Sequence, residues 1–158
     1  SFDLRVFTQA NGQVKEERRV AIALTGRRSP AFWSGDDREA KFDLFHGGYP
    51  YIHEWATLAK NFANVYADQA WVHIISPEIG RQQLHELIET VPGNKIMAFG
   101  GDSVTVELAY AHSRMARQVV ARVLSEKVAD GYMDEAEAIA LAKRVLRDNP
   151  AELFKLAV

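Results

Sequence analysis

The amino-acid sequence predicts an α/β fold in which parallel strands alternate with helices. Three short apolar runs, at residues 41–45, 64–71 and 95–101, have the length and the aliphatic and aromatic content of buried strands. A helical pattern follows each run. Strands of one sheet that are joined through a helix are parallel, and the crossover is right-handed. The 158 residues fit a single domain, long enough for a sizeable core.

The first predicted strand, KFDLF at residues 41–45, is closed by Gly47 and Gly48. A helix is predicted after Pro50, because apolar side chains recur there at helical spacing. These side chains are Ile52, Trp55, Ala59 and Phe62. The second predicted strand is NVYADQAW, residues 64–71.

Ser76 and Pro77 mark the start of the next helix, since a capping hydroxyl precedes a proline at the first helical position. The tripeptide PGN at residues 92–94 ends that helix. The third strand, KIMAFGG at residues 95–101, is apolar enough to be buried on both faces. Residues 41–103 are therefore predicted to form three βα units.

Residues 104–158 are predicted to form extra C-terminal helices. A long apolar stripe follows the third strand and ends at the Asp-Gly of residues 130–131. Asp134 with Glu137 resembles a capping box at the start of the next helix. The Asn-Pro of residues 149–150 begins a last short helix.

The first forty residues carry weaker signals. Residues 3–8, DLRVFT, are a predicted strand, and the Asn-Gly of residues 11–12 is a turn signal. Residues 14–24 are predicted to form a helix with a charged start. Residues 25–40, rich in Gly, Ser, Arg and Asp, are predicted to form a loop.

The composition excludes several classes of protein. A net charge of −2 gives no reason to expect nucleic acid or an anionic membrane as partner. The absence of cysteine excludes a disulfide scaffold, thiolate metal sites and a cysteine nucleophile. We find neither an apolar run of membrane-spanning length nor a signal-peptide pattern, so a cytoplasmic location is expected.

Polar side chains stand where the three predicted strands end. The first strand is followed by His46, and the third by Asp102. The second ends in residues 68–71, DQAW, with His73 just beyond. In parallel α/β sheets the loops after the strands converge at one edge, where ligands bind. We therefore expect an imidazole and carboxylates to meet there.

Two kinds of chemistry suit such a pair. A neutral imidazole with a carboxylate suits Zn²⁺ or a similar divalent ion, and it equally suits general acid–base catalysis without metal. Taken singly, His46 could be a turn residue and Asp102 could be the N-cap of the helix that follows it. The coincidence of the two favours function. His53, His85 and His112 are predicted to be surface or packing residues.

Four segments carry a resemblance to a known family: KFDLFHGGYPY, NVYADQAWVHIISP, NKIMAFGGDS and DNPAELFKL. Their order and spacing resemble the amidohydrolase superfamily, and most closely its amidohydrolase-2 branch, which includes uronate-isomerase-like enzymes and decarboxylases. The similarity covers roughly residues 30–158. It implies the C-terminal half of a (β/α)₈ barrel with extra C-terminal helices.

The resemblance also implies an enzyme, namely a metal-dependent hydrolase in which a metal-activated water attacks a C–N or C–O bond of a small-molecule substrate. At the matching positions, His46 and Asp102 would bind the metal and take part in catalysis. The implied cofactor is a divalent metal ion, with zinc favoured. Trp71 and His73 would help to line the substrate pocket. Isomerisation or decarboxylation in the same kind of site is the alternative.

The chain departs from the family pattern because no histidine precedes His46, whereas the family places a His-x-His pair on its first strand. We expect either the C-terminal part of a longer protein or a barrel remnant that serves as a non-catalytic binding or assembly module. Half a barrel has two unpaired sheet edges, so a homo-oligomer or association with a missing N-terminal half is expected. A doubly wound phosphate-binding domain is disfavoured, since no glycine-rich phosphate loop follows the first strand.

Overall fold

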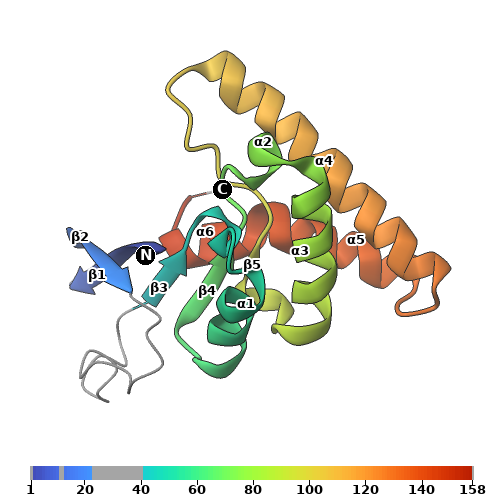
Figure 1. Ribbon diagram of the computed structural model, residues 1–158, viewed down its shortest axis with the longest axis horizontal. Helices are drawn as coiled ribbons and strands as arrows, with labels where there is room; N and C mark the ends of the chain where they lie inside the picture. Colours follow the sequence, from blue (N-terminus) through green and yellow to red (C-terminus); the bar gives the residue numbers. More distant parts are fainter. Residues whose placement is uncertain (1, 11–12, 23–40, 158) are drawn as a thin grey trace.

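The computed structural model of the chain describes residues 2–10, 13–22 and 41–157. Within these residues, five strands form one sheet in the order β2-β1-β3-β4-β5 (Figure 1). The strands are β1 (Phe2–Ala10), β2 (Gln13–Ile22), β3 (Lys41–Leu44), β4 (Val65–Asp68) and β5 (Ile96–Met97). Strands β3, β4 and β5 are parallel, whereas β1 is antiparallel to both β2 and β3.

The parallel strands confirm the predicted α/β class. Phe42 of β3 lies opposite Val65 of β4, and Ala67 of β4 lies opposite Ile96 of β5. The second and third strands are shorter than predicted, because the chain turns away after Asp68 and after Met97. Three parallel strands do not by themselves establish half a (β/α)₈ barrel, and that assignment stays a prediction, as does the single domain.

The helices that follow the parallel strands begin and end where local signals place them. They are α1 (Ile52–Asn61), the short α2 (Val72–Ile75) and α3 (Pro77–Thr90). Ser76 caps α3, since its side chain accepts a hydrogen bond from the amide of Ile79 (3.3 Å). Helix α3 ends just before Pro92, as predicted.

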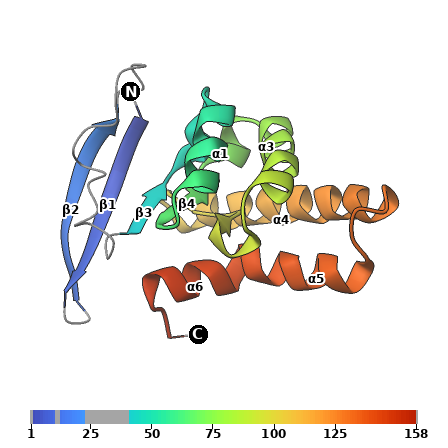
Figure 2. The same ribbon diagram turned by 90° about the horizontal axis from the view of Figure 1, so that it is seen from below.

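The C-terminal part is helical, as predicted. It comprises α4 (Val106–Ala129), α5 (Glu135–Lys143), a π-helical stretch (Arg144–Asp148) and α6 (Asn149–Phe154). Helices α4 and α5 lie side by side (Figure 2). The predicted capping box is present, because Asp134 and Glu137 each accept a hydrogen bond from the other's backbone amide. Among the described helices, none has both the length and the apolar character that crossing a membrane requires.

The hydrophobic core lies between one face of the parallel strands and helices α1, α3 and α4. Its buried members are Phe42, Leu44, Trp55, Ala56, Ala59, Val65, Ala67, Leu84, Leu87, Val91, Ile96, Ala98, Val119, Val120, Val123, Leu124, Ala138 and Val145. Because side chains alternate along a strand, Asp43 of β3 and Asp68 of β4 point to the opposite face. The core thus fixes the strand ends relative to the helices.

The N-terminal segment differs from its prediction. The helix predicted at residues 14–24 is wrong, because residues 13–22 form strand β2, paired with β1. The strand predicted at residues 3–8 is confirmed as β1, which runs antiparallel to β3. The predicted turn at residues 11–12 and the predicted loop at 25–40 lie outside the described residues.

One edge of the parallel unit has a strand partner, whereas beyond β5 no described strand follows and only individual hydrogen bonds are made. On one side, β1 pairs with β3. Beyond β5, the carbonyl of Val145 accepts a hydrogen bond from the amide of Ala98 (2.9 Å), and the Asn149 amide group donates to the carbonyls of Ile96 and Gly93 (both 2.7 Å). The C-terminal segment thereby satisfies backbone groups that an open edge would expose.

A buried lysine secures the end of α1. Lys95 is 5% exposed, and its ammonium donates to the carbonyls of Ala59 and Phe62. These carbonyls lie at the C-terminal end of the helix, where they have no intrahelical partner and where the helix dipole favours a cation.

Replacing Lys95 by methionine should lower the free energy of unfolding by about 1–3 kcal/mol, because the carbonyls of Ala59 and Phe62 lose the ammonium donor, although that of Phe62 keeps the amide of Val65, while the volume is nearly kept. Urea unfolding would measure the change. Lys60→Met, at an exposed position of the same helix, is the matched control and should change stability by less than about 0.5 kcal/mol. Equal stability of the two variants would contradict this role of Lys95.

Candidate functional site

Strained backbone marks the loops at the ends of the three parallel strands. His46 after β3, Trp71 after β4 and Asp102 after β5 have φ angles of 63°, 66° and 37°. Non-glycine residues rarely adopt positive φ, and each instance costs about 1–3 kcal/mol. Such residues persist where the surroundings hold them, and they concentrate at functional sites. The three strained positions coincide with three of the four predicted site residues.

The structure brings His46 and Asp102 together. Their side chains form a hydrogen bond, with Nε2 of His46 3.0 Å from Oδ2 of Asp102. Because an ionised carboxylate can only accept, the imidazole Nε2 carries the proton. The side chains are 39% and 41% exposed, so a small molecule can reach both. The predicted meeting of imidazole and carboxylate at one edge of the sheet is confirmed.

Asp102 is not a helix cap. The N-cap of α4 is Thr105, whose hydroxyl accepts a hydrogen bond from the amide of Leu108 (3.3 Å). The alternative interpretation of Asp102 as the capping residue is therefore wrong, and its carboxylate is available to His46. Capping of α4 therefore does not explain why an aspartate occupies position 102.

Trp71 lies beside this pair. Its ring centroid is 6.2 Å from that of His46, with the two planes inclined by 55°, and the residue is 41% exposed. Its backbone amide donates to the carbonyl of Gly100 (3.2 Å), which ties the end of β4 to the segment before Asp102. The indole is thus placed to form one wall of the site, although contact with a substrate stays a prediction.

His73 lies below the surface. It is fully buried, and its Nε2 bonds to the carbonyl of Ala98 (2.9 Å). Burial lowers the pKa of His73, because the charged form would lose its hydration. Its ring makes an edge contact with that of His112, which is also fully buried (5.7 Å between centroids). Substrate contact by His73 is untested, and its burial favours another role.

Two buried aspartates on the opposite face of the sheet were not among the predicted site residues. Burial raises the pKa of Asp68 to about 7; a hydrogen bond from the Ala70 amide opposes this shift, and the charge of Asp102 adds to it. Burial, together with the charge of Asp68, also raises the pKa of Asp43. Neither oxygen of Asp43 has a hydrogen-bond partner in the part of the chain that the structure describes. The site therefore has a protonatable carboxyl beneath it.

The donor chemistry of His46 and Asp102 fits a divalent metal ion, since imidazole nitrogen and carboxylate oxygen are ordinary zinc ligands. Two protein ligands are fewer than the three or four that zinc sites use. Across the side chains described within residues 41–157, no group of three His, Cys, Asp or Glu could hold a metal ion. The pair can supply part of a metal site but not all of it.

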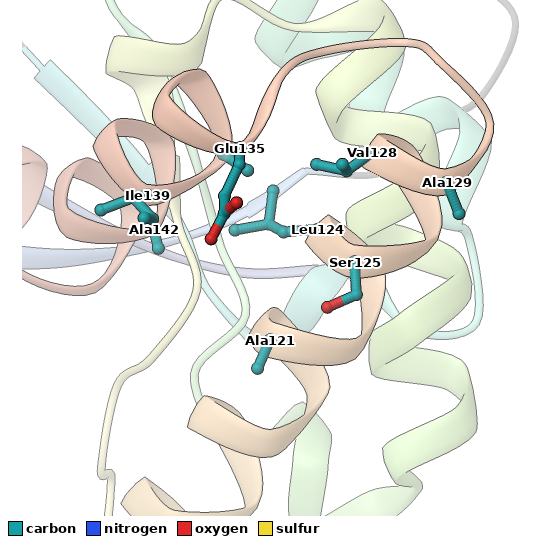
Figure 3. A pocket seen from close by; sticks show the side chains of 9 residues that line it. Ala121, Leu124, Ser125, Val128, Ala129, Glu135, Ile139 and Ala142 are labelled. Atoms are coloured by element: carbon teal, nitrogen blue, oxygen red, sulfur yellow. The ribbon is translucent and has the colours of Figure 1, made fainter.

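An apolar groove lies elsewhere on the molecule. It has a volume of about 490 Å³ between α4 and α5 and is lined by Leu124, Ile139 and small neighbours (Figure 3). Glu135 is the one ionisable side chain in its lining. The groove begins at Ala121, fifteen residues or about 20 Å along α4 from its start near Asp102. It lacks the chemistry of the strand-end site and is separate from it.

Comparison with known proteins adds two similarities. No family model matches the chain. Protein fluG of Emericella nidulans is 28% identical to it over 119 residues, which cover 75% of this chain and 14% of fluG. The crystal structure of a candidate metal-dependent hydrolase from Lactobacillus casei ATCC 334 is similar in fold, with a TM-score of 0.59 and 25% identity, over 73% of this chain and 31% of that one. The chain thus spans less than a third of either protein's length.

Proposed function

We propose that this chain carries part of the active site of a metal-dependent hydrolase of the amidohydrolase kind, acting on a C–N or C–O bond of a small molecule. The observation that supports it is the hydrogen bond between His46 and Asp102, two strained residues that follow β3 and β5 of one parallel sheet. The name given to the Lactobacillus casei protein supports a metal-dependent hydrolase, without specifying the amidohydrolase kind.

The two side chains have complementary roles in this proposal. The Asp102 carboxylate accepts the proton that is released when water attacks the substrate, and the His46 imidazole, whose Nε2–H bonds to Asp102, would hold the metal through its other ring nitrogen, Nδ1. Trp71 lies against the same space and packs against the body of the substrate. When bound, a divalent ion supplies an activated water at neutral pH.

The remaining ligands of such an ion come, in this proposal, from outside the described residues. A second copy of the chain or a further protein segment would bring them to the exposed edge that His46 and Asp102 occupy. Isomerisation or decarboxylation would use the same two side chains.

A second candidate is a non-catalytic binding or assembly module. It is favoured by the observation that the side chains described within residues 41–157 contain no group of three metal-binding residues. In that case His46 and Asp102 hold two loops together and nothing more.

Zinc titration of the complete protein by calorimetry separates the two candidates, because the remaining ligands come from outside the described residues. For the hydrolase, we expect saturable binding of Zn²⁺ that His46→Ala weakens about tenfold or more, since a ligand is lost. His53→Ala is the matched control, because His53 also pairs with a carboxylate, that of Glu86 (2.9 Å), but on the surface of α1. Equal zinc binding by the two variants, or none by the unmodified complete protein, would argue for the binding module.

A further inference from the structure

The positive φ angles of His46 and Asp102 persist only if surrounding contacts hold these residues in place. The structure shows such contacts, made by buried polar side chains, below each residue. Four polar side chains lie fully buried beneath the strand ends, namely Gln69, His73, Gln83 and His112. They fall into two pairs: Gln69 and Gln83 are joined by a hydrogen bond, and His73 and His112 are in ring contact. One pair reaches the turn that carries His46, and the other reaches the segment that carries Asp102.

Under His46, the support is a chain of two amides. The side-chain amide of Gln83 on α3 donates to the carbonyl of Gly47 (3.0 Å), the residue next to His46. Gln69 donates in turn to Oε1 of Gln83 (3.2 Å) and to the carbonyl of Gly80 (2.9 Å). A Cβ at position 47 would lie 2.2 Å from Gln83 Oε1, so glycine at this position is what lets the turn approach the amide.

Under Asp102, the support is a pair of imidazoles. His73 Nε2 donates to the carbonyl of Ala98 (2.9 Å), directly after β5. The ring of His112 packs between those of His73 and Phe99, with centroids 5.7 Å and 5.3 Å away. Its Nδ1 lies 3.4 Å from the carbonyl of Gly101, the residue before Asp102. The segment from Ala98 to Gly101 is thus bonded at both ends.

Stability alone does not explain these four residues. Within the described part of the chain, Gln69 Oε1, His73 Nδ1 and His112 Nε2 are buried without a hydrogen-bond partner. Each such atom carries the cost of lost hydration, whereas apolar side chains of similar size would fill the same space without it. Buried polar groups that carry this cost call for an explanation other than packing, and a role in fixing the geometry of a site is one such explanation.

We propose that Gln83 and His73 are positioning residues for the strand-end pair: Gln83 fixes the turn that carries His46, and His73, with His112 packed against it, fixes the segment that carries Asp102. The network holds the two functional side chains at hydrogen-bonding distance before any ligand arrives. The catalytic consequence rests on the proposed function, but the positioning itself does not.

The tautomer of the His46 ring can be measured directly. Long-range proton–nitrogen NMR spectra of the chain with ¹⁵N-labelled histidine report which ring nitrogen of His46 carries the proton. In the unmodified chain we expect the proton on Nε2, held by Asp102. Gln83→Met and His73→Leu should shift His46 to a mixture of both tautomers. His73→Gln, whose amide can occupy the place of Nε2, should restore the single tautomer.

Asn149→Leu is the matched control. Asn149 is also a buried amide that donates to backbone carbonyls, but those of Gly93 and Ile96, before the strand end. It should lower stability and leave the His46 signal unchanged. If Gln83→Met and His73→Leu also leave that signal unchanged, the network is merely structural and the proposal is wrong.

Two further measurements complete the test. Should Gln83→Met or His73→Leu fail to fold, His73→Gln and His73→Asn decide instead: the proposal requires a single tautomer in the first and a mixture in the second. If the unmodified chain binds zinc, the dissociation constant for zinc should rise about tenfold in the disrupted variants. A complete protein that binds no zinc, together with the expected tautomers in this chain, would count against the proposed hydrolase and not against the positioning.

Discussion

Asp102→Asn should lower kcat/KM for hydrolysis by about 10²–10⁴, the usual contribution of a group that accepts a proton in the reaction. Asparagine has nearly the same shape, and its amide oxygen can still accept a hydrogen bond from His46, but it cannot take up the proton. The measurement is turnover of a panel of small amides, esters and lactones by the complete protein with a divalent metal supplied.

Stability should hardly respond to the same change. Because Thr105 caps α4, loss of the Asp102 charge removes no cap, and the free energy of unfolding should stay within about 0.5 kcal/mol. Glu86→Gln, in the exposed pair with His53, is the matched control and should leave turnover unchanged. Full activity of Asp102→Asn would overturn the catalytic role and leave the binding module as the better interpretation.

The meeting of His46 and Asp102 could be predicted because it depends on few non-local facts. Once residues 41–45 and 95–101 are recognised as strands of a parallel sheet, the residues that follow them must lie at the same edge. Local signals were equally reliable at helix starts. Ser76 and the pair Asp134 with Glu137 act through bonds within one turn, which any fold preserves.

Prediction from the sequence failed where the structure of a segment depends on residues far away in the chain. Residues 13–22 contain lysine, glutamate and arginine, which favour a helix, yet they form β2 because β1 pairs with them. Asp102 and Thr105 both have the chemistry of an N-cap, and only the path of the chain after β5 determines which of them takes that place. His73 lies close to Trp71 in sequence, but one ring is buried and the other exposed.

The burial of Asp68 also could not be predicted from the sequence. The sequence places a carboxyl at the end of the second strand, yet a carboxyl there could equally face water. Its burial, and with it the raised pKa, depends on the packing of the whole sheet. This burial leads to the second large expected effect.

The contribution of Asp68 to the free energy of unfolding should fall as the pH rises from about 4 to about 7. The pKa of this carboxyl is about 7 in the folded chain, against 3.8 for an ordinary aspartate. Between these values the folded chain binds more protons than the unfolded chain, so raising the pH favours unfolding. At about 1.4 kcal/mol for each pKa unit, the contribution of Asp68 is on the order of 4 kcal/mol.

Asp68→Asn tests this account, because asparagine stays neutral at every pH and its side-chain oxygen can still accept from the Ala70 amide. Urea unfolding at about pH 5 and about pH 8 should show that the variant gains stability relative to the unmodified chain as the pH rises. Asp130→Asn, at an exposed position after α4, should leave the pH dependence unchanged. If Asp68→Asn loses stability equally at both pH values, the carboxyl is ionised in the folded chain throughout, and a cation or donor must neutralise it. The proton on Asp68 would then no longer be available beneath the site, although the pairing of His46 with Asp102 would be unaffected.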